Sequence, residues 1–423
     1  MNHFDYRQGI LHAEDVPIPL IAAEVGTPFY CYSTATLQRH YQVFSDAFAE
    51  IDAMVCYAMK ANSNQAVLKT LAKMGSGADV VSGGELRRAR QAGIPASRIL
   101  FSGVGKSVED IDYALSEEIL CFNVESEPEL ERLSKRAVIA GKTASVSFRI
   151  NPDVDARTHA KISTGKAEDK FGIPWHDALR IYAKAASLPG IKVTGIDMHI
   201  GSQIVELEPF DRAIARLGEL VAKLRDAGHQ IEHIDLGGGL GIPYRDDNEA
   251  PPDPPAYAKV VINQVKALNC RVFFEPGRLI VGNAGVLVTK VEYVKAGHNK
   301  TFVIVDAAMN DLIRPTLYEA WHEIRPVQLA AANAPRIVAD IVGPVCESGD
   351  YLAKAREIAP VRQDDLIAVG SAGAYGAVQS CTYNTRPLIP EVLVDGGNYH
   401  VVRPRPSYDE LLALDSMPDW LTD

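Results

Sequence analysis

The sequence predicts an α/β protein: a (β/α)8 TIM-type barrel followed by a C-terminal antiparallel β domain. From about residue 50 to residue 275, short apolar runs alternate with longer stretches whose apolar residues recur every three or four positions. After Pro276 the pattern changes to alternating apolar and β-branched runs with few helical stretches between them. We therefore expect a barrel over residues 26–278 and a β domain over residues 279–423, to which residues 1–25 also contribute.

Eight apolar runs between Ala53 and Pro276 are the expected barrel strands: AMVCYAM, ADVVS, RILFSG, LCFNV, ASVSFRI, KVTGIDMHI, HIDLGG and RVFFEP. Amphipathic stretches such as NQAVLKTLAKMG and FDRAIARLGELVAKLRDAG lie between them, and each ends in a glycine that can stop a helix. This number of strand and helix units fits a closed barrel. An open doubly wound sheet fits less well, because no GxGxxG follows the first strand.

The β domain is expected from runs such as TFVIVDAAM, RIVADIVG, DLIAVGSAG and EVLVDGGNYHVV. Two further segments are expected to be loops of the barrel. The proline-rich stretch from Glu249 to Tyr257 is predicted to be a stiff surface loop. The polar stretch from Asp155 to Gly172 is predicted to be mobile and near the mouth of a site.

The composition is ordinary for a globular protein of 423 residues, with 47% hydrophobic and 23% charged residues. A net charge of −11 argues against nucleic-acid and anionic-membrane partners, which select clustered Lys and Arg. We find neither a signal-peptide pattern nor a long apolar run, so a cytoplasmic location is expected. The six cysteines include no CxxC pair, so we expect no metal site and no disulfides. Cys346 is expected in a loop, and the other five in the core.

Polar residues and glycines follow most of the expected barrel strands. The carboxyl ends of barrel strands form one rim, which carries the reacting groups of barrel enzymes. Any single residue there is more often structural: Lys60 could reach solvent, His199 could be a core histidine, and Glu275 could cap a strand. Together they predict one shared site. Its members are Lys60, Asp79, Arg149, Asn151, His199, Gly201, Ser202, Gly237, Gly238, Gly239, Glu275, Gly277 and Arg278.

The glycines after the seventh strand indicate an anion site. The run DLGGGLG, Asp235 to Gly241, lets backbone N–H groups approach a phosphate. The run EPGR adds a glycine and the guanidinium of Arg278, which suits phosphate or carboxylate. With an amine at Lys60, a flat ring at His199 and a carboxylate at Glu275, these are the parts that hold pyridoxal phosphate, with Lys60 forming the Schiff base.

The chain resembles the diaminopimelate decarboxylases, which are alanine-racemase-like, fold type III pyridoxal phosphate enzymes. The resemblance runs in order across nearly the whole chain through YAMKANSN, ADVVSGGEL, HIGSQ, DLGGGLGIPY, FEPGR, DAAMNDLIRPTLY, GPVCESGD and SAGAYG. It implies pyridoxal-phosphate-dependent decarboxylation of meso-2,6-diaminopimelate to L-lysine and CO2, the final step of lysine biosynthesis. It also implies a homodimer.

The resemblance implies a role for each matching residue near the cofactor. Lys60 would bind pyridoxal phosphate covalently and His199 would stack on its ring. Glu275 would keep the pyridine nitrogen protonated, which favours decarboxylation, whereas a racemase of this fold has an arginine there. The other cofactor-binding residues would be Asp79, Ser202, Gly238, Gly239, Gly277, Arg278 and Tyr375.

The resemblance also implies how the far end of the substrate is read. Its carboxylate and ammonium would be bound by Arg278, Arg314, Tyr318, Glu347 and Tyr375. Arg314 and Tyr318 share a face if their segment is helical. Cys346 would be catalytic, because a thiol that is protonated at neutral pH can return a proton to the α-carbon. In this family Cys346 and Glu347 come from the second subunit, so the homodimer would share its active sites.

Two alternatives stay open. Another decarboxylase of this fold would act on carboxynorspermidine, ornithine, arginine or a carrier-bound amino acid, but Arg314, Tyr318 and Glu347 argue against these substrates. A non-catalytic homologue would carry pyridoxal phosphate or bind partners. Such proteins typically lack the catalytic cysteine or the second domain, and this chain has both.

Overall fold

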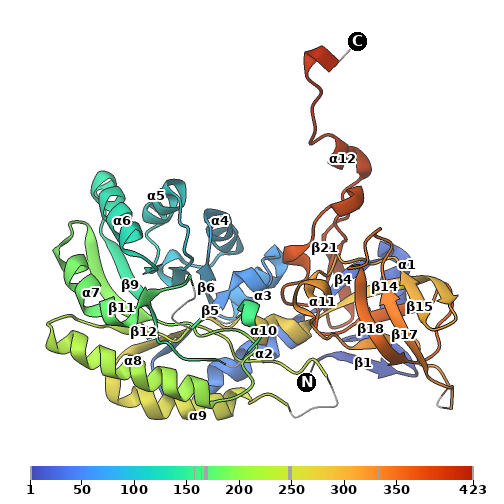
Figure 1. Cartoon of the computed structure of the whole chain (residues 1–423), viewed down its shortest axis with the longest axis horizontal. Helices are drawn as coiled ribbons and strands as arrows, with labels where there is room; N and C mark the ends of the chain where they lie inside the picture. The colour runs from blue at the N-terminus through green and yellow to red at the C-terminus, as the bar shows by residue number, and fades with distance from the viewer. Residues whose placement is uncertain are drawn as a thin grey trace. The chain divides into compact units, whose positions relative to one another are not determined.

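The computed structural model describes residues 2–156, 158–162, 164–165, 170–245, 250–331 and 333–421. Contacts within the chain divide it into two units (Figure 1). The first, the barrel unit, is Leu37–Val281, and the second, the β unit, consists of Met1–Thr36 and Gly282–Asp423. The domain limits that we expect from the sequence, 26–278 for the barrel and 279–423 for the β domain, stay predictions.

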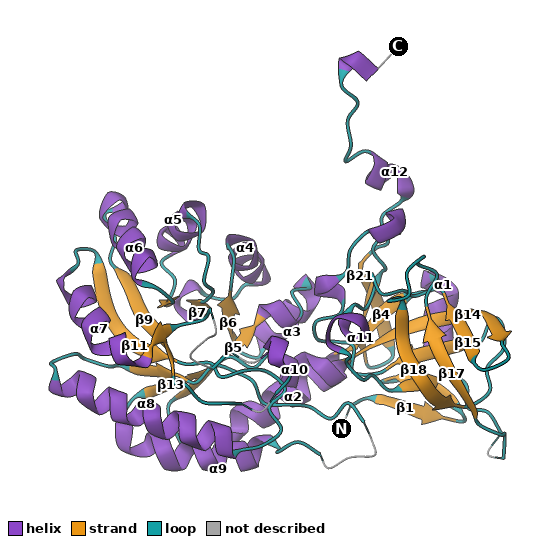
Figure 2. Cartoon of the chain, viewed as in Figure 1, coloured by secondary structure: helices purple, strands orange, loops and turns teal. Residues whose placement is uncertain are grey.

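The barrel unit contains a closed ring of eight parallel strands (Figure 2). The ring closes because β8 pairs with β9 and β13 pairs with β5. All eight predicted strands are confirmed, and the predicted closed barrel with them. The strands are β5 (Ala53–Ala58), β6 (Gly77–Val80), β7 (Ile99–Phe101), β8 (Cys121–Val124), β9 (Ala144–Asn151), β11 (Ile191–Asp197), β12 (His233–Asp235) and β13 (Arg271–Phe274), with a short β10 (Ile173–Pro174) beside β9.

Helices lie around the outside of the strands (Figure 2). They are α2 (Thr34–Ala47), α3 (Gln65–Lys73), α4 (Gly83–Ala92), α5 (Val108–Glu117), α6 (Glu127–Ala140), α7 (Ala178–Ser187), α8 (Glu208–Asp226), α9 (Pro254–Val265) and α10 (Arg278–Val281). Serine side chains cap the amino ends of α4, α5 and α6, and left-handed glycines end α4 and α6 at Gly93 and Gly141. The two glycine stops that we predict are correct as well: Gly75, with a φ of 86°, follows α3, and Gly228, with a φ of 90°, follows α8.

The predicted proline-rich loop is wrong over its second half. Helix α9 begins at Pro254, and the side chain of Asp253 caps it by accepting a hydrogen bond from the backbone of Ala256. Proline suits the first helical turn because its missing N–H would have no partner there. The predicted mobile loop from Asp155 to Gly172 lies partly outside the described residues, and its motion stays a prediction.

The β unit is built on a mixed sheet in the order β18-β17-β15-β14-β4-β20-β21, with β19 paired to β14 and β16 paired to β19. Most neighbours are antiparallel as predicted, but β15 with β17 and β20 with β4 are parallel. The strands are β4 (Phe29–Ser33), β14 (Gly285–Ala296), β15 (Thr301–Val305), β16 (Ile324–Pro326), β17 (Ile337–Val342), β18 (Tyr351–Ile358), β19 (Leu366–Val369), β20 (Glu391–Asp395) and β21 (Asn398–Arg403).

The amino-terminal segment also belongs to the β unit. It forms a small sheet of β1 (Phe4–Arg7), β2 (Ile10–Ala13) and β3 (Val16–Pro17), followed by α1 (Ile18–Val25). Two short helices, α11 (Arg314–Tyr318) and α12 (Tyr408–Leu412), complete the unit. Strand β4 lies inside the residue range predicted for the barrel, yet it pairs with β14 and β20.

All six cysteines are free thiols, and their burial differs from the prediction in two cases. Cys31, Cys56 and Cys121 are buried, as expected for core residues. Cys270 is half-buried and Cys381 is exposed, so the core prediction is wrong for Cys381. Cys346 is exposed in a loop, as expected. Among the described residues, no helix combines the length and apolar character needed to cross a membrane.

Gly195 in β11 provides a test of barrel packing. A Cβ at this position would lie 2.2 Å from Nε2 of His233. The His233 ring cannot move aside easily, because it is buried and stacks on Phe273. Gly195→Ala is expected to destabilise the protein by about 1–3 kcal/mol through overpacking.

The matched control is Gly218→Ala in helix α8. Its Cβ would meet Leu268 at an ordinary 3.6 Å. Alanine is expected to stabilise this helix by up to about 1 kcal/mol. Thermal and urea unfolding of both variants measure the difference, and equal unfolding midpoints would contradict the packing described for β11.

Candidate active site

Lys60 lies at the carboxyl end of β5, in a single 3-10 turn, Met59–Ala61. Its Nζ is 3.1 Å from Oδ2 of Asp79, which belongs to β6. The Asp79 side chain is fully buried, whereas the Lys60 side chain is 38% exposed. The amine therefore reaches the open rim of the barrel while a buried carboxylate holds it in place.

Three more carboxylates gather inside the barrel. The ligand oxygens of Asp197, Asp235 and Glu275 lie within 4.8 Å of one another, and all three residues are buried. Burial, and then the charge of Asp235, raise the pKa values of Glu275 and Asp197 well above their usual range. Burial raises the pKa of Asp235 to about 6. Burial and the mutual repulsion of these carboxylates therefore favour the protonated forms of the cluster.

A cluster of this kind suits two kinds of positively charged partner. Three carboxylates form an oxygen donor set that a hard metal cation can use. They suit equally well a protonated nitrogen of an aromatic ring. Our expectation that no metal takes part stays a prediction.

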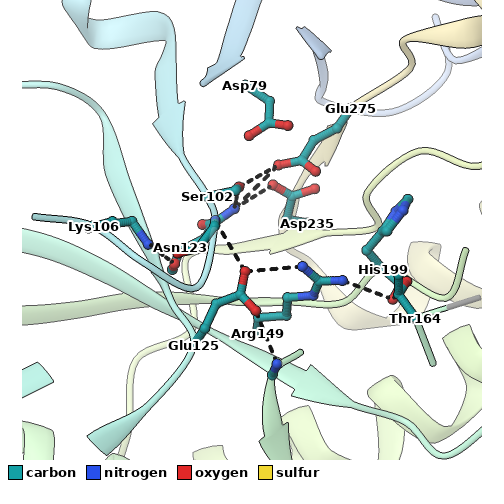
Figure 3. A network of polar contacts seen from close by, with 12 residues as sticks. Asp79, Ser102, Lys106, Asn123, Glu125, Arg149, Thr164, His199, Asp235 and Glu275 are labelled. Carbon is teal, nitrogen blue, oxygen red and sulfur yellow. Dashed lines mark hydrogen bonds and ion pairs between the residues drawn. The ribbon is translucent and has the colours of Figure 1, made fainter. Parts of the chain in front are cut away.

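Asn123 and Ser102 hold the Glu275 carboxylate (Figure 3). The Asn123 Nδ2 lies 3.3 Å from Oε1 of Glu275 and 3.4 Å from Oδ2 of Asp235. The Ser102 hydroxyl donates to the same Glu275 oxygen at 3.3 Å. Sequence reasoning missed both residues, although each lies at a strand end in a run that we identified, where side chains of neighbouring strands converge.

Arg149 supports the backbone at His199 (Figure 3). Its Nη1 pairs with Glu125 at 3.1 Å and its Nη2 lies 3.5 Å from the carbonyl oxygen of His199. The hydroxyl of Thr164 donates to the same carbonyl at 3.0 Å. Arg149, which we predict at the rim, therefore contacts the backbone carbonyl of His199.

The His199 ring is neutral and fixed by the glycine run. The backbone N–H of Gly238 donates to its Nδ1 at 3.2 Å. Burial, and then the positive charges of Arg149 and Lys60, hold the pKa of His199 well below its usual range. A flat, uncharged ring suits packing against an aromatic cofactor.

The glycine run passes so close to its neighbours that no side chain fits. A Cβ at Gly237 would lie 2.7 Å from His199 Nδ1, one at Gly238 2.3 Å from the Glu275 carbonyl oxygen, and one at Gly239 2.4 Å from the Gly201 carbonyl oxygen. Gly237 and Gly239 also have positive φ angles of 63° and 109°. Bare backbone is therefore required at this strand end.

Arg278 brings a positive charge to the same rim. Its Nη2 lies 3.0 Å from the Ser202 hydroxyl and its Nη1 lies 2.6 Å from the hydroxyl of Tyr244, a residue that sequence reasoning missed. Next to it, a Cβ at Gly277 would lie 3.0 Å from the Cβ of Ala61. Close backbone, a guanidinium and a hydroxyl fit a phosphate group, and the amine of Lys60 and the Glu275 carboxylate fit the rest of pyridoxal phosphate.

The remaining predicted residues belong to the β unit. Arg314 is buried and Tyr318 half-buried at the two ends of α11, so the segment is helical, which is the condition under which we expect the two residues to share a face. Cys346 and Glu347 are exposed in the loop between β17 and β18. Tyr375 is half-buried, with a positive φ of 57°.

Hydrogen bonds tie the Cys346 loop to the segment around α11. Asp350 accepts from the backbone N–H groups of Met309 at 2.7 Å and Val345 at 2.6 Å, and Thr316 donates to the carbonyl of Gly349. Tyr383, which sequence reasoning missed, donates to Glu347 at 3.0 Å. The DAAMND, RPTLY and VCESGD motifs therefore form one packed group.

The structure brings the predicted site residues together in two groups. The barrel residues lie at the carboxyl ends of the strands, where Lys60 contacts Asp79, His199 contacts Gly238, and Gly238 lies against the Glu275 backbone. The second group, around Arg314 and Cys346, lies in the β unit. The roles that we assign to these residues stay predictions.

Comparisons with known proteins agree with this chemistry. The family model of the pyridoxal-dependent decarboxylases, pyridoxal binding domain, matches residues 34–282. Diaminopimelate decarboxylase of Zymomonas mobilis is 50% identical over 99% of both chains, and that of Pseudomonas aeruginosa is 51% identical, again over 99% of both chains.

Two solved structures of diaminopimelate decarboxylases complexed with L-lysine are also similar. That from Helicobacter pylori is 39% identical, with a TM-score of 0.89 over 94% of this chain and 98% of the other. That from M. jannaschii is 35% identical, with a TM-score of 0.95 over 100% of both chains. The chain therefore belongs to the pyridoxal-dependent decarboxylases and, within them, to the diaminopimelate decarboxylase family.

Proposed function

We propose that this protein catalyses the pyridoxal-phosphate-dependent decarboxylation of meso-2,6-diaminopimelate to L-lysine and CO2, the final step of lysine biosynthesis. The observation that carries the proposal is the convergence of Lys60, the glycine cradle beside Arg278, and the buried carboxylate Glu275 at one barrel rim. Full-length identity of about half to diaminopimelate decarboxylases supports it. The L-lysine bound in two relatives is the product of this reaction.

In this proposal the barrel rim holds the cofactor. Lys60 binds it covalently, with Asp79 as the charge partner of the amine. The phosphate and its surroundings belong to Ser202, Gly238, Gly239, Gly277 and Arg278, and His199 packs against the ring, with Tyr375 adding a hydroxyl. When bound, pyridoxal phosphate supplies an electron-withdrawing ring that accepts the electron pair left on the α-carbon as CO2 departs.

Glu275 controls the proton on the ring nitrogen. Burial, and then the charge of Asp235, raise the pKa of this carboxyl well above its usual range, so it holds a proton more tightly than an exposed glutamate does and can share that proton with a ring nitrogen placed against it. Hydrogen bonds from Asn123 and Ser102 to Oε1 fix the orientation of the carboxyl group. A protonated ring nitrogen favours loss of CO2 over racemisation.

Residues of the β unit, with Arg278 of the barrel unit, bind the far end of the substrate and return the proton. Arg278 and Arg314 bind the distal carboxylate, Tyr318 and Tyr375 offer hydroxyls, and Glu347 pairs with the distal ammonium. Cys346 donates a proton to the α-carbon after CO2 has left. A decarboxylase acting on ornithine or arginine has no distal carboxylate to bind and would not need Arg314.

We also propose that the protein works in the cytoplasm as a homodimer, in which one protomer supplies Lys60 and its partner supplies Cys346 and Glu347 to each active site. The exposure of Cys346 and Glu347 is compatible with a role at a site completed by a second chain.

Lys60→Ala is expected to abolish covalent cofactor binding, because it removes the amine that forms the bond. Purified wild-type protein should show the visible absorbance band of the bound cofactor, and the variant should not. Lys73→Ala, which removes an exposed lysine at the end of α3, is the control and should keep the band. An unchanged spectrum in Lys60→Ala would end the assignment of this lysine.

A panel of amino acids tests the substrate. The holoenzyme is expected to release CO2 from meso-2,6-diaminopimelate and not from lysine, ornithine or arginine, because only the first offers a carboxylate at the distal end. Trapped CO2 and the amino-acid product measure the outcome. Turnover of ornithine or arginine at a similar rate would select another decarboxylase, and no turnover at all would favour a binding protein.

Cys346→Ala is expected to reduce turnover by about 10²-fold or more through loss of the proton donor, while cofactor content changes little. Cys270→Ala removes the half-buried thiol at the opposite, amino end of β13 and should leave turnover unchanged. Loss of cofactor in Cys346→Ala would contradict the assignment.

Hybrid dimers test whether the site is shared. Mixing inactive Lys60→Ala and Cys346→Ala proteins and allowing subunits to exchange should restore up to about a quarter of wild-type activity, since a mixed dimer then has one complete site. No recovery despite exchange would place both residues of a site in the same chain.

A further inference from the structure

His322 and Arg314 form a close, buried pair in the β unit. The Nη1 of Arg314 lies 2.7 Å from the Nε2 of His322. Arg314 is 6% exposed and His322 is completely buried. Arg314 is the first residue of α11, and His322 follows the helix after its left-handed end at Glu319. Arginine and histidine are seldom fully buried unless a partner satisfies their polar groups, so the protonation state of this pair has to be worked out.

The contacts determine the protonation state of His322. Its Nδ1 lies 2.8 Å from the carbonyl oxygen of Gly370, which can only accept, so the ring hydrogen is on Nδ1. Its Nε2 faces a guanidinium, which can only donate, so Nε2 must offer its lone pair. His322 is therefore a neutral imidazole. An imidazolium would direct a second N–H toward the guanidinium.

The backbone around His322 is anchored. The backbone N–H of Gly370 donates to the carbonyl of Glu323 at 2.8 Å, which extends the pairing of β16 with β19. Arg356 donates to the carbonyl of His322 at 2.6 Å and stacks 3.2 Å above the Trp321 ring centroid. His322 is thus a fixed point to which Arg314 is attached.

A neutral acceptor is the right partner for an arginine that must bind a carboxylate. A carboxylate partner would orient Arg314 but would also cancel its charge. A neutral imidazole orients the guanidinium through one of its five N–H donors and leaves the positive charge for the ligand. Fixing a long, flexible side chain before binding also lowers the entropy that binding must overcome.

We propose that His322 is a positioning residue that pre-orients Arg314, through its neutral Nε2, to read the distal carboxylate of the substrate. The inference rests on the proposed role of Arg314. It adds a residue that sets specificity without touching the substrate itself.

The test compares two amine ligands of the holoenzyme. Decarboxylation of one end of the substrate leaves L-lysine, which keeps the distal carboxylate, whereas 1,5-diaminopentane lacks it. The ratio of their inhibition constants therefore measures recognition of the carboxylate alone. Cofactor content and the thermal unfolding midpoint are recorded for every variant.

Two variants separate the two hydrogen bonds of His322. In His322→Asn, the amide can still donate to Gly370 but is too short to reach Arg314. In His322→Gln, the longer amide can offer its oxygen to Arg314. We expect His322→Asn to weaken the preference for L-lysine by about tenfold, the value typical of a hydrogen bond to a charged group. His322→Gln should restore it to within about threefold of wild type, and inhibition by 1,5-diaminopentane should change little in either variant.

The matched control is His12→Asn. His12, also in the β unit, is half-buried, and its Nδ1 contacts the carbonyl of Ile10. Its replacement should leave the ligand ratio unchanged. A purely structural role of His322 would lower the unfolding midpoint in both His322 variants and leave the ratio at the wild-type value, which would overturn the inference.

Arg314→Lys separates failure of the inference from failure of the proposed function. If it lowers the ratio and His322→Asn does not, only the role of His322 is overturned. If it leaves the ratio unchanged, Arg314 does not read the distal carboxylate, and both assignments fall. If His322→Asn does not fold, His322→Gln alone tests the inference. A ligand ratio far below the wild-type value in folded, cofactor-loaded His322→Gln would show that an amide oxygen that accepts a hydrogen bond from Arg314 does not orient it.

Discussion

Closure of the parallel barrel is the constraint on which the barrel site depends. Because every strand runs in the same direction, all eight carboxyl ends meet at one rim. Three residues that are far apart in the sequence follow these strands: Lys60, His199 and Glu275. Because the β8–β9 and β13–β5 pairs close the ring, all three lie at the same rim. The backbone approach at Gly237 to Gly239 is equally a product of this geometry, since their neighbours are residues of the adjacent strand ends.

Charge is arranged differently in the two groups of residues. Inside the barrel, burial, and then the charges of neighbouring carboxylates, raise the pKa values of Asp197, Asp235 and Glu275. The environment proposed for the ring nitrogen therefore favours the protonated forms of these acids. In the β unit, by contrast, the buried guanidinium of Arg314 contacts a neutral ring, that of His322.

Neutral histidines beside cations occur in both units. His199 stands near Arg149 and Lys60, and His322 contacts Arg314 directly. In each case a neighbouring group fixes the ring through Nδ1: the Gly238 N–H for His199 and the Gly370 carbonyl for His322. An uncharged imidazole can thus be placed next to a positive charge without repelling it.

The sequence by itself determined the element order and most of the barrel site. Apolar periodicity is a local property, so it located all eight barrel strands, and motif spacing pointed to Lys60, His199, Glu275 and Arg278. It did not reveal β4, because the pairing of this strand depends on a partner distant in the chain, β14. It did not reveal β18 either, because Lys354, Arg356 and Glu357 interrupt the apolar run of that strand. It also misjudged Pro254, since a loop composition and a helix start share the same residues.

Only the tertiary structure decided which side chains support the site. Asn123, Ser102 and His322 carry no motif of their own, and their importance lies in the atoms that they meet: the Glu275 oxygen for the first two and the Arg314 guanidinium for the third. Hydrogen-bond partners, burial and protonation are properties of contacts between distant segments. A sequence motif can identify the residue that performs the chemistry. The residues that orient that side chain can be identified only from the packed structure, because they contact it from distant segments.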